Sequence, residues 1–152
     1  MKTVPWFLNY WLPVLLWMAL IFGFSTDVGS SHRTSRIIGP VLRWLIPDIS
    51  DQAVERVQFA ARKGGHLTEY AILAGLAWRA LRQPWKHDQR RWSRRHALGA
   101  LLFAVVFAAT DEWHQSTVPT RQGQVSDVLL DGLGASAGLM AIWLAGRKLK
   151  RW

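Results

Sequence analysis

The chain has 152 residues, a formal net charge of +9 and no cysteine, so disulfides and thiolate metal sites are excluded. In a soluble protein this charge would indicate nucleic acid or an acidic surface as partner. Half of the residues are hydrophobic, however, ten are tryptophan, and no nucleic-acid-binding motif is present. We therefore expect no nucleic acid partner, and the length has room for one domain.

The first apolar segment, residues 6–24, carries no charge, and Asn9 is its only plainly polar side chain. About 19 residues suffice to cross a hydrocarbon core of roughly 30 Å at 1.5 Å per residue. A cleaved signal peptide is the alternative, but the stretch is too long for one and no Ala-x-Ala site follows Phe24. We expect a retained transmembrane helix, slightly kinked at Pro13.

Residues 25–62 are predicted to form a long outer connection. Its apolar stretch 37–46 is too short to span and is interrupted by Pro40, so it is expected to lie along the interface or partly re-enter. Further on, Ser50 or Asp51 is predicted to cap an amphipathic surface helix. Gly64-Gly65 is expected to let that helix bend into the next span.

Three further spans are predicted at about 64–81, 96–113 and 125–144. None is strongly apolar alone, but together they alternate with hydrophilic segments at a spacing that suits a bundle. Gly134-x-x-x-Gly138 in the last span is typical of close helix packing. The predicted fold class is an all-α integral membrane protein, a bundle of four transmembrane helices with interfacial helices in the outer connection.

The distribution of charge predicts the orientation of these spans. The segment 79–95, the tail from residue 147 and Lys2 together hold twelve of the 19 basic residues. They hold only one of the ten acidic residues. The positive-inside rule assigns these segments to the cytoplasm. Four spans bring both termini to that side. We expect a multi-pass protein of the bacterial inner membrane with both termini in the cytoplasm.

The same topology brings polar side chains from every span to the outer leaflet. Lys63, His66 and Tyr70 have the i, i+3, i+7 spacing of one helical face, and Asp127 and Asp131 share a stripe four residues apart. The predicted binding residues are Ser25, Lys63, His66, Glu69, Tyr70, Asp111, Glu112, Gln115, Arg121, Asp127 and Asp131.

An ionised side chain at bilayer depth costs at least about 2.5–3.5 kcal/mol, so these groups are expected to face the bundle and to pair. One interpretation is a self-neutralising lattice in which Lys63 and Arg121 balance the carboxylates. The carboxylates outnumber these bases, however. This excess favours a pocket for a polar or cationic group or a metal ion.

The chemistry of such a pocket is left open by the sequence. The catalytic candidates are His66, Glu69, Asp111 and Glu112. The same four with His114 could ligate a metal, but their spacing is not diagnostic and no HExxH is present, so no metal site is assigned. Ser25 and Ser116 are available nucleophiles with His66 or His114 as bases, without a GxSxG frame.

Two spaced motifs carry a resemblance to a known family. The first is Lys63-x-x-His66-x-x-Glu69-Tyr70-x-x-Leu73, and the second is DExxQxxxPxRxxxxxDxxxDxxG from Asp111 to Gly134. With Phe24-Ser25 at the end of the first span, they make about residues 24–138 resemble the VanZ-like family of small bacterial membrane proteins. Thr120 stands where family members often have glycine before the arginine, and Asp27 replaces an amide.

The resemblance implies a role in the cell envelope, because the family is named for a determinant of resistance to teicoplanin, a lipoglycopeptide antibiotic. The expected partner is a membrane lipid, a lipid-linked cell-envelope precursor or the antibiotic, bound in an outward-facing polar pocket. The alternative is a membrane-embedded hydrolase or transferase with His66 or Glu69 as base and Asp111, Glu112 and Asp127 holding a cation. A transporter or assembly subunit is a third. The sequence leaves open whether the chain is an enzyme, which cofactor it uses and whether it forms a homo-oligomer.

Overall fold

The computed structural model describes residues 5–26, 31–84, 88, 90–119 and 123–151, with only the backbone of 31–37. Within these ranges the chain forms helices and no strand, which confirms the predicted all-helical class. The helices are α1 (Trp6–Tyr10), α2 (Leu12–Phe24), α3 (Ser31–Leu45), α4 (Asp51–Arg82), α5 (Arg94–Thr117) and α6 (Val125–Lys148).

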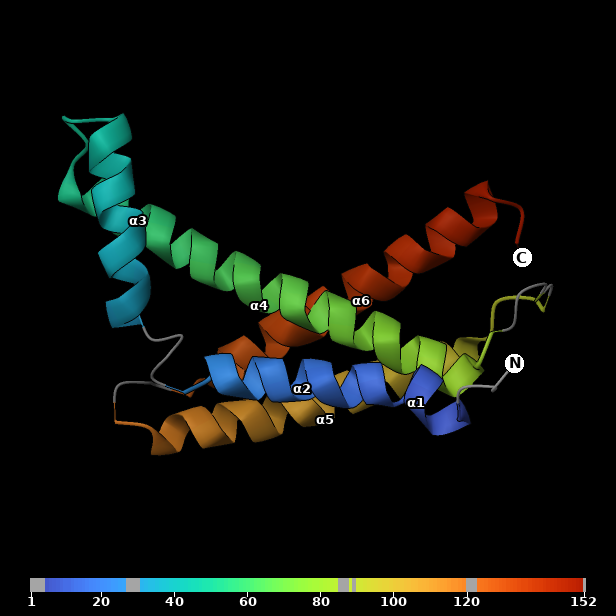
Figure 1. Cartoon of the computed structure of the whole chain (residues 1–152). Helices are drawn as coiled ribbons and strands as arrows, with labels where there is room; N and C mark the ends of the chain where they lie inside the picture. Colours follow the sequence, from blue (N-terminus) through green and yellow to red (C-terminus); the bar gives the residue numbers. More distant parts are fainter. Residues whose placement is uncertain (1–4, 27–30, 85–87, 89, 120–122, 152) are drawn as a thin grey trace.

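The core of the molecule is the packing of α4, α5 and α6 against one another, with α2 lying along α4 (Figure 1). The start of α1 and the end of α6 lie at the same end of this bundle as the end of α4 and the start of α5 (Figure 1). At the opposite end, α3 contacts the first half of α4 and stands apart from the other helices (Figure 1).

In the described part of the chain, α5 and α6 are the two helices long and apolar enough to cross a membrane, judged by length and composition. They correspond to the third and fourth predicted spans and are somewhat longer than predicted. The apolar α2 is shorter, with 13 residues, and α4 is long but carries charges along its first half. The bundle of four membrane spans therefore stays a prediction.

The side chains of α5 are arranged with the small residues inside and the large apolar residues outside. Ala100, Ala104 and Ala108 are fully buried. Leu98, Leu102 and Val106, by contrast, are exposed over 66%, 65% and 55% of their surface. A soluble bundle buries its large apolar side chains, whereas helices packed in lipid meet through small ones. The pattern is typical of a helix packed against others in a membrane.

The first predicted span is divided at Trp11 into α1 and α2, because Pro13 lies in the first turn of α2. A proline has no N–H to donate to the carbonyl four residues earlier, here that of Asn9. Arg79 of α4 replaces the missing donor, since its Nη1 donates to the Asn9 carbonyl at 2.7 Å. The kink expected at Pro13 is thus stabilised by a neighbouring helix.

Two expectations about the outer connection were wrong. Pro40 does not interrupt its helix, because α3 continues through it from Ser31 to Leu45. Gly64-Gly65 does not separate a surface helix from a span, since both belong to the uninterrupted 32-residue α4. Glycine costs only about 1 kcal/mol in a helix interior and keeps its backbone hydrogen bonds, so two glycines weaken α4 without breaking it.

The start of α4 agrees with prediction, because Ser50 caps it by accepting a hydrogen bond from the Ala53 N–H at 3.3 Å. The close approach of α6 to its neighbour is also confirmed. A Cβ on Gly134 would lie 2.4 Å from the Leu67 carbonyl oxygen, and one on Gly138 would lie 2.4 Å from that of Ala71. The backbones of α4 and α6 therefore touch, and this contact places the polar start of α6 against α4.

Candidate functional site

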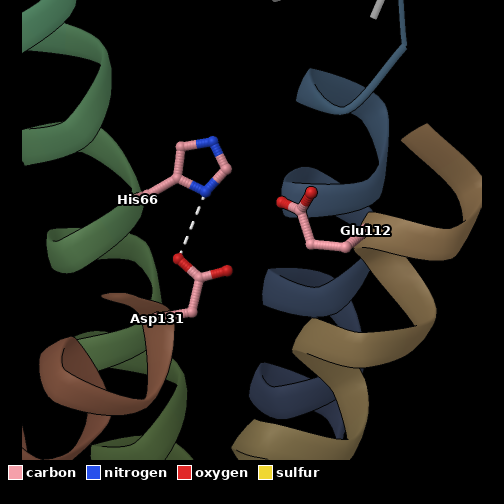
Figure 2. A group of neighbouring side chains, drawn as sticks. All are labelled: His66, Glu112 and Asp131. Carbon is pink, nitrogen blue, oxygen red and sulfur yellow. Dashed lines mark hydrogen bonds and ion pairs between the residues drawn. The ribbon is translucent and has the colours of Figure 1, made fainter. Parts of the chain in front are cut away.

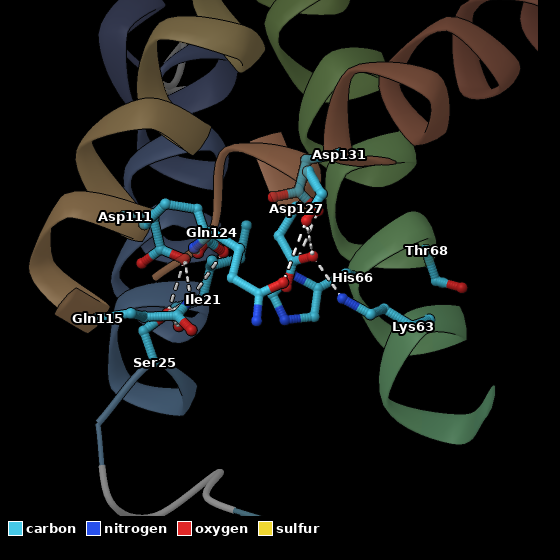
Figure 3. A network of polar contacts seen from close by, with 12 residues as sticks. Ile21, Ser25, Lys63, His66, Thr68, Asp111, Gln115, Gln124, Asp127 and Asp131 are labelled. Atoms are coloured by element: carbon cyan, nitrogen blue, oxygen red, sulfur yellow. Dashed lines mark hydrogen bonds and ion pairs between the residues drawn. The ribbon is translucent and has the colours of Figure 1, made fainter. Parts of the chain in front are cut away.

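Polar side chains from α2, α4, α5 and α6 gather at the end of the bundle opposite the chain termini (Figure 3). The structure connects eight of the predicted binding residues into hydrogen-bonded groups: Ser25, Lys63, His66, Asp111, Glu112, Gln115, Asp127 and Asp131. Arg121 lies outside the described residues, and so do Asp27 and Thr120.

The first group joins the end of α2 to the end of α5. Ser25 Oγ donates to Asp111 Oδ2 at 2.8 Å, and Gln115 Nε2 donates to the same oxygen at 3.0 Å. All three side chains are buried. The contact is possible because α2 is held along α4, where Trp17 Nε1 donates to the Glu69 carbonyl at 2.9 Å. Asp111 is therefore a buried carboxylate fixed by two donors.

Glu112 links this first group to the turn between α5 and α6. Its Oε1 accepts a hydrogen bond from Gln115 Nε2 at 3.3 Å, and its Oε2 accepts one from the Gln124 N–H at 2.9 Å. The turn passes so close to α5 that a Cβ on Gly123 would lie 2.1 Å from the Glu112 carbonyl oxygen. Glycine is required there, and the close passage holds the Glu112 carboxylate in place.

The second group consists of two parallel pairs between α4 and α6. Lys63 Nζ forms an ion pair with Asp127 Oδ1, and one turn further His66 Nδ1 lies 3.2 Å from Asp131 Oδ1. The spacing of three residues on α4 and four on α6 keeps the partners in register. The Asp131 side chain has no exposed surface, whereas that of its partner His66 is exposed over 12% of its area.

Three of these side chains, one from each of α4, α5 and α6, converge on a single point (Figure 2). One potential ligand atom each of His66, Glu112 and Asp131 lies within 4.8 Å of the other two. Within the described ranges, Asp131 Oδ2 and Asp111 Oδ1 are buried and have no hydrogen-bond partner. The arrangement offers two carboxylates and an imidazole to a cation, a hydrogen-bond donor or a transferred proton.

The converging group differs from the set of metal-ligand candidates in the sequence. It contains His66 and Glu112 but not Glu69, Asp111 or His114, and it adds Asp131. His114 instead packs against Phe22, with 4.1 Å between ring centroids. The four-residue spacing of the two aspartates on α6 was the available signal for Asp131. It placed that residue in the predicted binding set but not among the ligands.

The remaining candidates occupy other surroundings. Tyr70 is fully buried and its ring lies 6.3 Å from that of Phe107. Ser116 Oγ donates to the Trp113 carbonyl at 2.6 Å, and Ser25 donates as described above. Among the described residues, neither serine is hydrogen-bonded to a histidine, so the geometry does not form a Ser–His nucleophile pair.

The opposite end of the bundle holds a second polar network. In the sequence its basic residues served only to predict the orientation of the spans. Arg82 is buried, and its Nε lies 3.3 Å from Asp88 Oδ2. Arg90 donates from Nε to Asp88 Oδ1 at 2.9 Å, and these hydrogen bonds lower the pKa of the Asp88 carboxyl well below its usual range. A cavity of about 310 Å³ between α5 and α6 also lies at this end, with an apolar lining that includes Trp92 and Trp143.

A family model described as VanZ/LLP1 matches residues 10–146. The chain belongs to the VanZ/LLP1 family. The match covers the last residue of α1, all of α2 to α5, and all but the last two residues of α6, so the resemblance drawn from the two motifs is confirmed. Membership of this family, together with two membrane-length apolar helices, indicates a membrane protein and is consistent with a role in the envelope or in antibiotic resistance. No curated protein and no solved structure matched the chain.

Proposed function

We propose that this VanZ/LLP1 protein binds the polar head group of a membrane lipid or lipid-linked cell-envelope precursor in an outward-facing cluster. A lipoglycopeptide antibiotic, which carries its own lipid tail, is a ligand of the same kind. The observation that carries the proposal is the set of buried carboxylates at one end of a bundle whose lateral surface is apolar. A lipid presents its polar part at this depth and its apolar part beside the helices.

The membrane arrangement that the proposal needs has four spans. The two spans besides α5 and α6 would be residues 6–24, which include α2, and the second half of α4. Their support is the packing of α2 along α4 and the position of the start of α1 and the end of α6 at the same end of the bundle as Arg82 and Arg90 (Figure 1). The positive-inside rule then assigns that basic end to the cytoplasm and the polar cluster to the outer leaflet.

The charge of the cluster favours a ligand with positive charge or with hydrogen-bond donors. Asp111, Glu112 and Asp131 are buried; in the described part of the chain Asp131 pairs with the His66 ring, while Lys63 pairs with Asp127. Buried carboxylates require donors, because an unsatisfied charged group costs more than about 1–3 kcal/mol. An amino or hydroxyl-rich head group supplies such donors.

The proposal is tested by measuring the lipids that stay with the protein. The chain is purified in mild detergent from bacterial membranes, and the co-purified lipids and lipid-linked precursors are identified by native mass spectrometry. Glu112→Gln and Asp111→Asn should reduce the retained species at least fivefold. Asp51→Asn is the matched control, because Asp51 is an exposed carboxylate that pairs with Arg43 far from the cluster. Equal retention by all three variants would contradict the proposal.

An enzyme acting on a lipid-linked substrate is the second candidate, and the contact between His66 and Asp131 favours it. A carboxylate that orients a histidine is the usual support of a general base, and Glu112 lies beside the pair. The test is hydrolysis or group transfer with purified lipid-linked precursors. A loss of turnover in His66→Gln with lipid retention unchanged would establish the enzyme, and no turnover in the wild type would exclude it for those substrates.

A further inference from the structure

We infer that His66, Glu112 and Asp131 form a binding site for a divalent transition-metal ion of the zinc and manganese class. The inference deepens the proposed function, because the ion would lie among the groups proposed to bind the head group. Its test measures the metal alone, so the two proposals can fail separately.

The first support is the convergence of three ligand atoms from three helices. His66 of α4, Glu112 of α5 and Asp131 of α6 each offer an atom within 4.8 Å of the other two (Figure 2). Bonds of about 2.0–2.2 Å to a tetrahedral zinc ion place ligand atoms roughly 3.4 Å apart. Small rotations of the long Glu112 side chain and of the His66 ring would bring the ligand atoms from their present separation of up to 4.8 Å to the separation that zinc requires.

The second support is a buried oxygen without a partner. Asp131 is fully buried, and its Oδ2 has no hydrogen-bond partner in the part of the chain that the structure describes. Figure 2 shows the carboxylates of Asp131 and Glu112 turned toward each other across the space beside the His66 ring. An ionised carboxylate left unsatisfied in this way costs more than about 1–3 kcal/mol, and a cation between the two groups removes that cost.

The third support is the balance of charge. Two carboxylates and a neutral imidazole carry a charge of about −2, which a divalent ion neutralises. The neighbouring Lys63 pairs with Asp127 instead. Glu112 is also oriented by the Gln124 N–H at 2.9 Å and by Gln115 at 3.3 Å, as carboxylate ligands in metal sites commonly are.

The donor atoms select the class of metal. An imidazole nitrogen with carboxylate oxygens suits zinc, manganese or iron, whereas magnesium and calcium prefer oxygen ligands alone. Copper(I) prefers thiolate or thioether ligands, which the group lacks. Three protein ligands leave a coordination position for water or for an oxygen of the bound head group.

The experiment measures zinc bound to the purified full-length chain in detergent. The protein is stripped with a chelator, dialysed against excess Zn²⁺ or Mg²⁺, passed through a desalting column and analysed by inductively coupled plasma mass spectrometry. We expect about one zinc per chain, little magnesium, and less than a tenth of the wild-type zinc in His66→Gln, Glu112→Gln and Asp131→Asn. His114→Gln is the matched control, because His114 packs against Phe22 outside the group. This variant should bind zinc as the wild type does.

The folding of each variant is checked by circular dichroism and by its elution volume. If Asp131→Asn fails to fold, the near-isosteric Glu112→Gln decides. X-ray absorption of the zinc-loaded protein should give nitrogen and oxygen neighbours at about 2.0–2.2 Å with the outer-shell signal of one imidazole. Absence of zinc in the wild type, retention in folded Glu112→Gln, or equal loss in His114→Gln would each overturn the site. Lipid retention that persists without zinc would leave the proposed head-group binding standing.

Discussion

At the scale of single residues, the structure shows how the bundle tolerates polar groups that its helices cannot satisfy alone. The Asn9 carbonyl, deprived of its helical donor by Pro13, accepts from the guanidinium of Arg79. Arg79 also donates to the Asn9 side chain at 3.1 Å and lies 4.9 Å from the ring centroid of Tyr10. A residue that in the sequence appears only as part of a basic segment therefore joins α1 to α4.

Arg79→Met should lower the free energy of unfolding in detergent by about 1 kcal/mol, because it removes the donor to the Asn9 carbonyl. In a Pro13→Ala background the backbone N–H at position 13 satisfies that carbonyl, and the same substitution should cost clearly less. The double-mutant cycle is measured by denaturant titration followed by circular dichroism. Equal costs in the two backgrounds would show that Arg79 does not compensate for the proline.

Asp88 should make the stability of the chain depend on pH in the acid range. Hydrogen bonds from Arg90 and the nearby Arg82 lower the pKa of the folded Asp88 carboxyl below the ordinary value of about 3.9. Its contribution is therefore fully present above that value and is lost as the pH falls toward the lower folded pKa. Asp88→Asn should be less stable than the wild type at pH 6, and the difference should shrink steadily below about pH 4. The melting temperatures of both proteins, measured across this pH range, check the prediction. A difference between them that does not change with pH would contradict it.

At the scale of helices, backbone contact between α4 and α6 sets the position of the site. Gly134 and Gly138 face Leu67 and Ala71 at distances that leave no room for a Cβ. Asp131 lies one turn before Gly134, so this contact brings its carboxylate to His66. A longer distance between the two helices would separate that pair as well as weaken the packing.

Gly138→Ala should lower the free energy of unfolding by about 1–3 kcal/mol, because the added methyl group meets the backbone of α4, which cannot rotate away. Gly64→Ala is the matched control, since nothing lies within 4 Å of a Cβ there. That substitution should stabilise α4 by up to about 1 kcal/mol through helix propensity. Denaturant titration compares the two, and a neutral Gly138→Ala would mean that the helices can move apart at little cost.

At the scale of the whole molecule, the two ends of the bundle differ in chemistry. One end joins buried carboxylates through Ser25, Gln115 and His66, and the other holds Arg82 and Arg90 around a single aspartate. An apolar lateral surface separates them. The proposed orientation, with the basic end in the cytoplasm, requires this difference between the two ends.

Single-cysteine variants test that orientation directly, because the natural chain has no cysteine. Asp48→Cys and Thr117→Cys lie at the carboxylate end and should react with an impermeant maleimide in intact spheroplasts. Lys150→Cys lies at the opposite end and should react only after the membrane is permeabilised. All three positions are exposed in the structure, so a difference in labelling reports the side of the membrane. Labelling of Lys150→Cys in intact spheroplasts would reverse the proposed topology.

The sequence alone predicted the helical class, the extent of α5 and α6 to within a few residues, the Ser50 cap and the close packing at Gly134 and Gly138. These features depend on local properties: hydropathy over a helix length, capping chemistry and the spacing of small residues. The two family motifs were equally visible, since they are runs of residue types along the chain.

Other features depended on the tertiary structure. The convergence of His66, Glu112 and Asp131 depends on how far each helix is rotated and shifted along its axis, which the contact between α4 and α6 and the tight turn at Gly123 decide. Helical spacing groups residues on one helix but does not say which faces meet. For the same reason the sequence did not show that Arg79 satisfies the carbonyl left open by Pro13, because that donor comes from a helix 70 residues away.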